Sequence, residues 1–174
     1  MRCYVSQSRS VENTLNGGRD LNLTASGNVN FTGIVGGVTP LSHLIINNAA
    51  NLTATTISAG SIQQLAGTGT STFNGNLTTS NSAGISLTGN SFSLNAGVFT
   101  GSTGSLTVAN SGFLTIAPGV NSLTIGGNLN QTGSGNFSLS GSAFSNGFMS
   151  FAGPVAISGT TVLNTPRIHK ISVS

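Results

Sequence analysis

Short three-residue units, in which two apolar residues flank a serine or threonine, recur along the chain and restrict its fold more than any other feature. They are Ile85–Leu87, Phe92–Leu94, Leu106–Val108, Leu114–Ile116, Leu123–Ile125 and Phe137–Leu139. In a strand, successive side chains point to opposite faces, so each unit would direct two apolar side chains inward and one hydroxyl outward. Glycine and asparagine around the units are typical of turns. The sequence therefore predicts very short β-strands separated by turns.

The spacing of these units indicates how the strands are arranged. They begin 7, 14, 8, 9 and 14 residues apart, and each long interval is expected to contain a weaker unit, such as Val98-Phe99 or Leu129. A strand and turn of seven to nine residues are short for a β-sandwich and suit a coil of about three strands. We therefore predict an all-β fold, a parallel β-solenoid of about eight short coils. The alternative is a pair of tandem antiparallel β-sandwiches with a boundary near residues 101–104.

A loose internal echo supports the solenoid. Residues 66–69 (AGTG) resemble residues 132–135 (TGSG), and a glutamine, Gln64 or Gln131, precedes each copy. A separation of 66 residues would correspond to three coils of about 22 residues each. Neither copy continues into a dinucleotide-binding G-x-G-x-x-G motif. The glycines are therefore expected to be corner residues, where glycine readily adopts a positive φ.

Charged residues are confined to the two ends of the chain. They are Arg2, Arg9, Glu12, Arg19, Asp20, Arg167 and Lys170. We therefore divide the chain into a charged N-terminal segment or cap (1–20), a β-solenoid body (21–166) and a charged C-terminal tail (167–174). An uncharged body suits a solenoid, since stacked coils would align like charges in columns. It also lacks the basic side chains that neutralise phosphates, so we expect no nucleic-acid partner.

The style of the repeats resembles a known family. The stretch SIQQLAGTGTSTFNGNLTTSNSAGISLTGNSFSLNAG, followed by GSLTVANSGFLTIAPG and GNFSLSGSAFSNGFMSFAGPVAISG, is similar to the β-strand repeats of bacterial surface proteins of the filamentous-haemagglutinin and autotransporter-adhesin type. The likeness covers roughly residues 38–165 and includes no active-site motif. It implies a right-handed parallel β-helix in a fragment of a longer protein. It also implies an extracellular or outer-cell-surface location, although no signal peptide is visible.

These features favour a non-catalytic structural or adhesive segment, a rigid stalk or a weak multivalent binder. The partners would be host or environmental glycans or surface proteins, contacted by hydroxyl and amide groups whose positions the sequence leaves open. We expect no cofactor and no metal. We also expect no membrane span, because no run of about 20 apolar residues exists. Exposed strand edges at the ends of a solenoid could also support end-to-end self-association.

Few residues are candidates for catalysis. A carbohydrate-active β-helix enzyme is a disfavoured alternative, because its chemistry relies on carboxylates and the body has none. Glu12 and Asp20 are expected to be solvated charges, and His43 a turn residue beside a strand. His169 has no Cys, Asp or Glu at metal-ligand spacing, and Cys3 has no partner base near it in sequence.

A second alternative function is binding to ice or another crystal surface, which a flat threonine ladder on a β-solenoid could provide. Thr53 and Thr55 form one T-x-T pair, and Thr70 and Thr72 form another. The pairs do not recur at a fixed interval in the sequence, so we place this function below the adhesive one.

Overall fold

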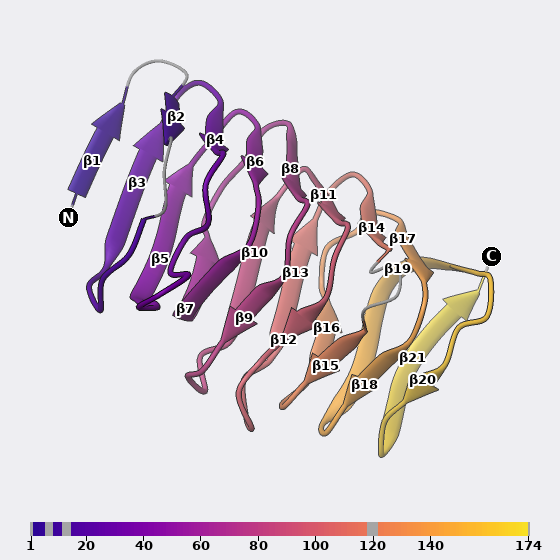
Figure 1. Cartoon of the computed structure of the whole chain (residues 1–174). Helices are drawn as coiled ribbons and strands as arrows, with labels where there is room; N and C mark the ends of the chain where they lie inside the picture. Colours follow the sequence, from indigo (N-terminus) through magenta and orange to yellow (C-terminus); the bar gives the residue numbers. More distant parts are fainter. Residues whose placement is uncertain (1, 6–8, 12–14, 118–121, 174) are drawn as a thin grey trace.

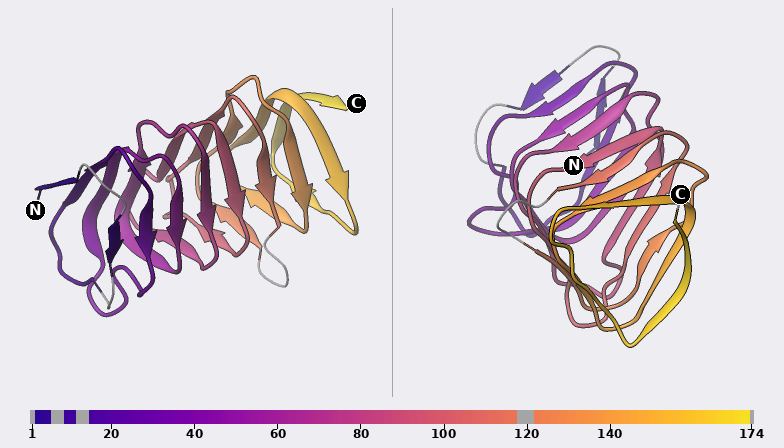
Figure 2. Two further views of the ribbon diagram at one scale, coloured as in Figure 1. Left: turned by 90° about the horizontal axis from the view of Figure 1, so that it is seen from above. Right: turned by 90° about the vertical axis from the view of Figure 1, so that its right-hand side faces the viewer.

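The chain winds into a β-solenoid, shown in Figure 1, in a computed structural model that describes residues 2–5, 9–11, 15–117 and 122–173. Among these residues there is no helix. From β3 (Leu21–Ala25) to β20 (Leu163–Asn164) the chain makes about seven turns, close to the eight expected. The two ends of the chain lie at opposite ends of the solenoid (Figure 2).

All pairings between the described strands are parallel. The predicted parallel β-solenoid is therefore confirmed. The antiparallel sandwiches are excluded, and residues 101–104 form part of the turn between β12 (Val98–Phe99) and β13 (Leu106–Asn110) rather than a domain boundary.

The strands stack into three ladders, which we call the first, second and third faces. The first face contains β1 (Arg2–Val5), β3, β5 (Leu41–Asn48), the later part of β7 (Ile57–Gln64), β10 (Ile85–Gly89), β13, β16 (Leu129–Gln131), the earlier part of β19 (Phe148–Ser158) and the earlier part of β21 (Arg167–Val173). The terminal strands β1 and β21 thus continue the ladder of the body. That the charged N-terminal segment (1–20) caps the solenoid stays a prediction.

The other two faces are built in the same way. The second face contains β2 (Arg9–Val11), β4 (Val29–Phe31), β6 (Leu52–Ala54), β8 (Thr70–Phe73), β11 (Ser91–Leu94), β14 (Leu114–Ile116), β17 (Phe137–Ser140) and the later part of β19. The third face contains the bridge residues Leu15 and Val35, the start of β7, β9 (Leu77–Thr79), β12, β15 (Leu123–Ile125), β18 (Ala143–Ser145) and β20.

Coil length varies although the strands remain in register. One inward position of the first face is occupied in successive coils by Leu21, Leu44, Ile62, Ile85, Leu106, Leu129 and Met149. A coil therefore contains 18 to 23 residues. This range agrees with the predicted length of about 22, and turns of different length absorb the variation.

The apolar residues of the repeated units fill the space between the faces. Both apolar positions of all six units are buried, and each intervening serine or threonine is at least partly exposed. The two weaker units expected in the long intervals are β12 and β16, with Val98 and Leu129 buried. Near the C-terminal end, the rings of Phe137 and Phe151 stack with centroids 4.8 Å apart. The alternation predicted from the sequence is confirmed.

Two glutamines interrupt the apolar interior at one column. Gln64 is followed in register by Leu87, Val108 and Gln131, so the echo in the sequence spans three coils, as predicted. The Gln131 Nε2 donates to Asn110 Oδ1 at 2.8 Å and to the carbonyls of Gly133 and Gly135. Its Oε1 accepts from the main-chain N–H groups of Ala152 and Gly153. The buried amide therefore fixes the turn between the first and second faces.

The glycines of the echo lie in corners, as predicted, but not because of positive φ. Gly67 and Gly69 follow β7, and Gly133 and Gly135 follow β16, yet none is among the glycines with positive φ. A Cβ on Gly133 would overlap the main chain of Asn110 in the preceding coil. Close approach of successive coils, rather than a left-handed backbone, therefore explains the need for glycine here.

Candidate functional site

A column of hydroxyl groups runs along the outside of the second face. Thr53, Thr72, Ser93, Thr115 and Ser138 occupy the same outward position in five successive coils. Neighbouring parallel strands lie about 4.8 Å apart, so the column extends for roughly 19 Å along the solenoid. We call it the hydroxyl column.

The sequence did not reveal this column because its members are unevenly spaced. The register places Thr53 beside Thr72. However, Thr55 follows Thr53 by two residues and lies on one side of the column. Thr70 precedes Thr72 by two residues and lies on the opposite side. The two T-x-T pairs therefore share one column and do not form a two-column threonine array. Ser93, Thr115 and Ser138 continue the column into later coils.

An open groove lies at the C-terminal end of the hydroxyl column. It has a volume of about 550 Å³, and its lining includes Phe113, Thr115, Asn136, Ser138 and Pro154. The Phe113 side chain is 63% exposed, whereas most of the other phenylalanines in the described residues are buried or partly buried. We call this feature the Phe113 groove. It combines an aromatic ring with polar side chains on an outward face.

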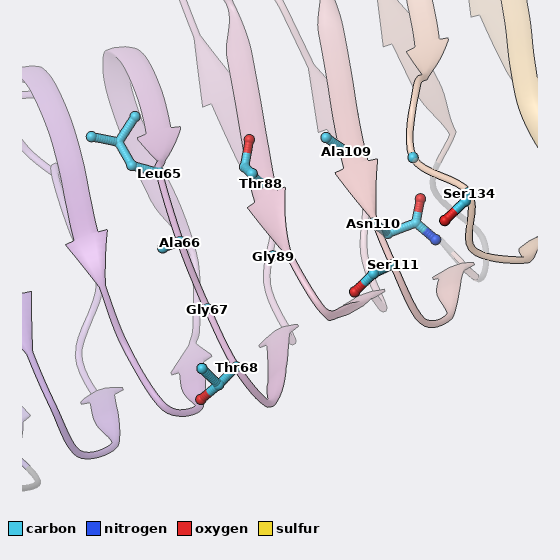
Figure 3. A pocket seen from close by; sticks show the side chains of 11 residues that line it. Leu65, Ala66, Gly67, Thr68, Thr88, Gly89, Ala109, Asn110, Ser111 and Ser134 are labelled. Carbon is cyan, nitrogen blue, oxygen red and sulfur yellow. The ribbon is translucent and has the colours of Figure 1, made fainter.

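A second cavity follows the corner between the first and second faces (Figure 3). It has a volume of about 410 Å³ and crosses four coils, from Leu65 and Gly67 to Ser134. Figure 3 shows that small residues line much of it, with Thr88 and Ala109 on neighbouring coils. The Asn110 amide is occupied, because its Nδ2 donates to Gly112 O at 2.8 Å and its Oδ1 accepts from Gln131. The hollow follows from the small side chains that the close corners require.

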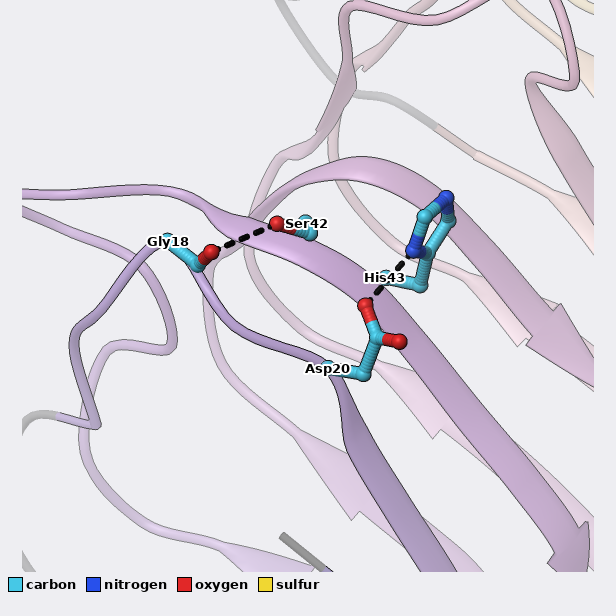
Figure 4. Close-up of polar contacts among 4 residues, drawn as sticks. All are labelled: Gly18, Asp20, Ser42 and His43. Atoms are coloured by element: carbon cyan, nitrogen blue, oxygen red, sulfur yellow. Dashed lines mark hydrogen bonds and ion pairs between the residues drawn. The ribbon is translucent and has the colours of Figure 1, made fainter.

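A close contact between the side chains of His43 and Asp20 lies on the outside of the first face (Figure 4). The Nδ1 of His43 lies 2.6 Å from Oδ1 of Asp20, and the two side chains are 44% and 58% exposed. The prediction that His43 is a turn residue is wrong, since it lies inside β5. Leu41 and Leu44 are both buried, which breaks strict alternation and leaves Ser42 and His43 partly exposed between them.

The Asp20–His43 pair lacks an engaged nucleophile. The Ser42 hydroxyl donates to the carbonyl of Gly18 at 2.6 Å, and Figure 4 shows it directed away from the imidazole. Ser61 stands beside His43 in the next coil, but no hydrogen bond between their side chains is found in the described part of the chain. The pair therefore supplies the histidine and the aspartate of a Ser-His-Asp arrangement without its serine.

The remaining residues considered from the sequence cannot be placed in a site. Glu12 lies outside the described residues. Cys3 and His169 lie in β1 and β21, and their side chains are likewise outside the description. Across the described ranges, no three His, Cys, Asp or Glu side chains are grouped so that they could hold a metal ion. The same ranges contain no helix able to cross a bilayer.

Comparisons with protein-family profiles, curated proteins and solved structures find no match to this chain. The solenoid, the hydroxyl column and the Phe113 groove are therefore the basis for a proposal about function.

Proposed function

We propose that this chain is a non-catalytic structural or adhesive segment of a large bacterial surface or secreted repeat protein. The hydroxyl column carries the proposal, because it presents similar polar groups at regular intervals on a rigid scaffold. A parallel solenoid hydrogen-bonds its main chain from coil to coil, which suits an extended stalk. The likeness of its repeats to those of filamentous-haemagglutinin and autotransporter adhesins supports a place at the cell surface.

The charge-free body limits how such a segment could bind. Residues 21–166 have no Asp, Glu, Lys or Arg, so contacts there would be hydrogen bonds and apolar packing. Each such contact is weak in water, but several along one rigid face act together because the later contacts form at high effective concentration. Glycans and uncharged protein surfaces are the partners that this chemistry favours.

Adhesion and product release together test the proposal. Beads carrying the purified chain are applied to surfaces coated with neutral polysaccharides, acidic polysaccharides or collagen, and the retained beads are counted under flow. The same polysaccharides are assayed for new reducing ends. We expect retention on at least one coating without product release. Release of reducing ends would contradict a non-catalytic role, and absence of retention on all coatings would remove the adhesive role.

Binding to ice or another crystal surface is a second candidate, which the hydroxyl column specifically favours. Thr53, Thr72 and Thr115 stand in register on one face and could match a repeating lattice. Thermal hysteresis of the purified chain separates this function from adhesion. We expect no hysteresis if the column serves adhesion, and a clear hysteresis gap that Thr72→Val removes if it serves ice.

A further inference from the structure

We propose that the Phe113 groove binds a neutral carbohydrate, with one pyranose ring packed against the Phe113 side chain. This inference rests on the proposed adhesive function and names the ligand class and the place of contact. The supporting observations are the order of side chains along the groove, their free hydrogen-bonding groups and their lack of charge.

Two outward columns border the groove. Because Leu114, Phe137 and Val155 are paired in register, the preceding residues Phe113, Asn136 and Pro154 form one column. Thr115, Ser138 and Ala156 form the other. The columns are two residues apart along each strand, or about 6.6 Å, and successive coils are about 4.8 Å apart. The groove is therefore of a width that suits a sugar ring.

The first column alternates apolar and polar surfaces. Phe113 and Pro154 flank Asn136, and all three are exposed. A pyranose has a flat face of C–H groups and a rim of hydroxyls, so it can pack on an aromatic face while its rim forms hydrogen bonds. Phe113 and the Asn136 amide supply these two kinds of contact one coil apart.

The polar side chains of the groove are available to a ligand. Within the described residues, the side chains of Thr115, Asn136 and Ser138 form no hydrogen bond with the protein, and Asn136 accepts from the Asn110 Nδ2 only through its main-chain oxygen. By contrast, in the preceding coil Ser91 Oγ accepts from the N–H of Phe113, and Ser93 Oγ donates to Asn95 Oδ1 at 2.8 Å. The hydroxyls of the preceding coil thus support the protein, while those of the groove can exchange water for sugar hydroxyls.

The uncharged lining of the groove distinguishes neutral from acidic carbohydrates. None of its lining residues is ionisable. An acidic sugar would lose hydration of its carboxylate without gaining a cation among the lining residues. A neutral sugar incurs no such penalty, so electrostatic matching favours neutral over acidic saccharides.

Binding by isothermal titration calorimetry and by amide chemical shifts tests the inference on the full chain. The probes are cellohexaose, mannohexaose and maltohexaose, with hexasaccharides of hyaluronan and polygalacturonate as acidic counterparts. We expect at least one neutral probe to bind and to shift amides of β14 and β17. Phe113→Ala should weaken that binding by about tenfold or more. Thr115→Val combined with Ser138→Ala should also weaken it by about tenfold.

Matched variants control for general effects. Phe144→Ala removes a 38% exposed ring on the third face, and Thr107→Val removes a partly exposed hydroxyl on the first face, outside both the groove and the hydroxyl column. Both should bind like the unsubstituted chain, and all variants should retain its thermal midpoint. If Phe113→Ala leaves neutral-sugar binding unchanged, the groove is not the binding site, although the adhesive function stands. If the chain binds only acidic probes or collagen, the neutral-carbohydrate proposal is refuted and the adhesive function again stands. If the chain binds no probe and no coating, both proposals are refuted.

Discussion

Replacing Gln131 with methionine should destabilise the solenoid strongly, although methionine has a similar length and is more apolar. Gln131 is 2% exposed, and its amide contacts five groups. Three of these groups belong to buried residues, namely Asn110 Oδ1, Gly135 O and Gly153 N. Leaving a buried polar group unpaired costs roughly 1–3 kcal/mol, so the free energy of unfolding should fall by about 3 kcal/mol or more.

Gln63 provides a matched control for this substitution. It lies in β7 on the outside of the same face, and no side-chain hydrogen bond involves it in the part of the chain that the structure describes. Gln63→Met should change the free energy of unfolding by no more than about 0.5 kcal/mol. Urea unfolding followed by far-ultraviolet circular dichroism measures both variants. Equal losses for the two glutamines, or a loss below about 1 kcal/mol at Gln131, would refute the assigned role of the buried amide.

Two further substitutions test the corner glycine and the contact between Asp20 and His43. Gly133→Ala should destabilise the chain by more than about 2 kcal/mol, because its Cβ would overlap the main chain of Asn110, whereas Gly18→Ala meets no atom within 4 Å. Similar thermal midpoints for these two variants would contradict the close-approach explanation. Asp20→Asn should lower the free energy of unfolding by less than about 1 kcal/mol, since its pair with His43 is largely exposed. A larger loss in urea unfolding would show that the pair stabilises the solenoid more than exposure allows.

The architecture could be predicted because one local rule repeats in every coil. Alternation within units such as Ile85–Leu87 identifies the inward positions, and turn residues mark the ends of the strands. The long intervals between units correctly indicated weaker strands at Val98 and Leu129. These signals depend on neighbouring residues in the sequence, which is why a single sequence was enough to reveal them.

The outer surface was harder to predict because it depends on register between coils. The members of the hydroxyl column are 19, 21, 22 and 23 residues apart, so no fixed interval connects them. The turns absorb these differences, and their lengths are known only once strands such as β8 and β11 are paired. The Phe113 groove was missed for the same reason, since Phe113 and Pro154 share a column only through that register.

Local irregularity explains the error at His43. Buried residues in β5 fall at Leu41, Leu44 and Ile46, so two partly exposed residues separate the first pair. A search for strict alternation ends the strand there and assigns His43 to a turn. The contact with Asp20 depends on the pairing of β3 with β5, which no local pattern indicates.

Distances between spin labels along the second face test the central structural claim most directly. With Cys3 replaced by serine, cysteine pairs carrying nitroxides join Asn30 to Thr115, to Ser138 or to Ala156, which lie four, five and six coils away. At about 4.8 Å per coil, double electron–electron resonance should give separations near 19, 24 and 29 Å. A steady increase of one strand spacing per coil would support parallel coils in register. Distances that fail to increase in this order would contradict the solenoid, and with it the hydroxyl column and the Phe113 groove.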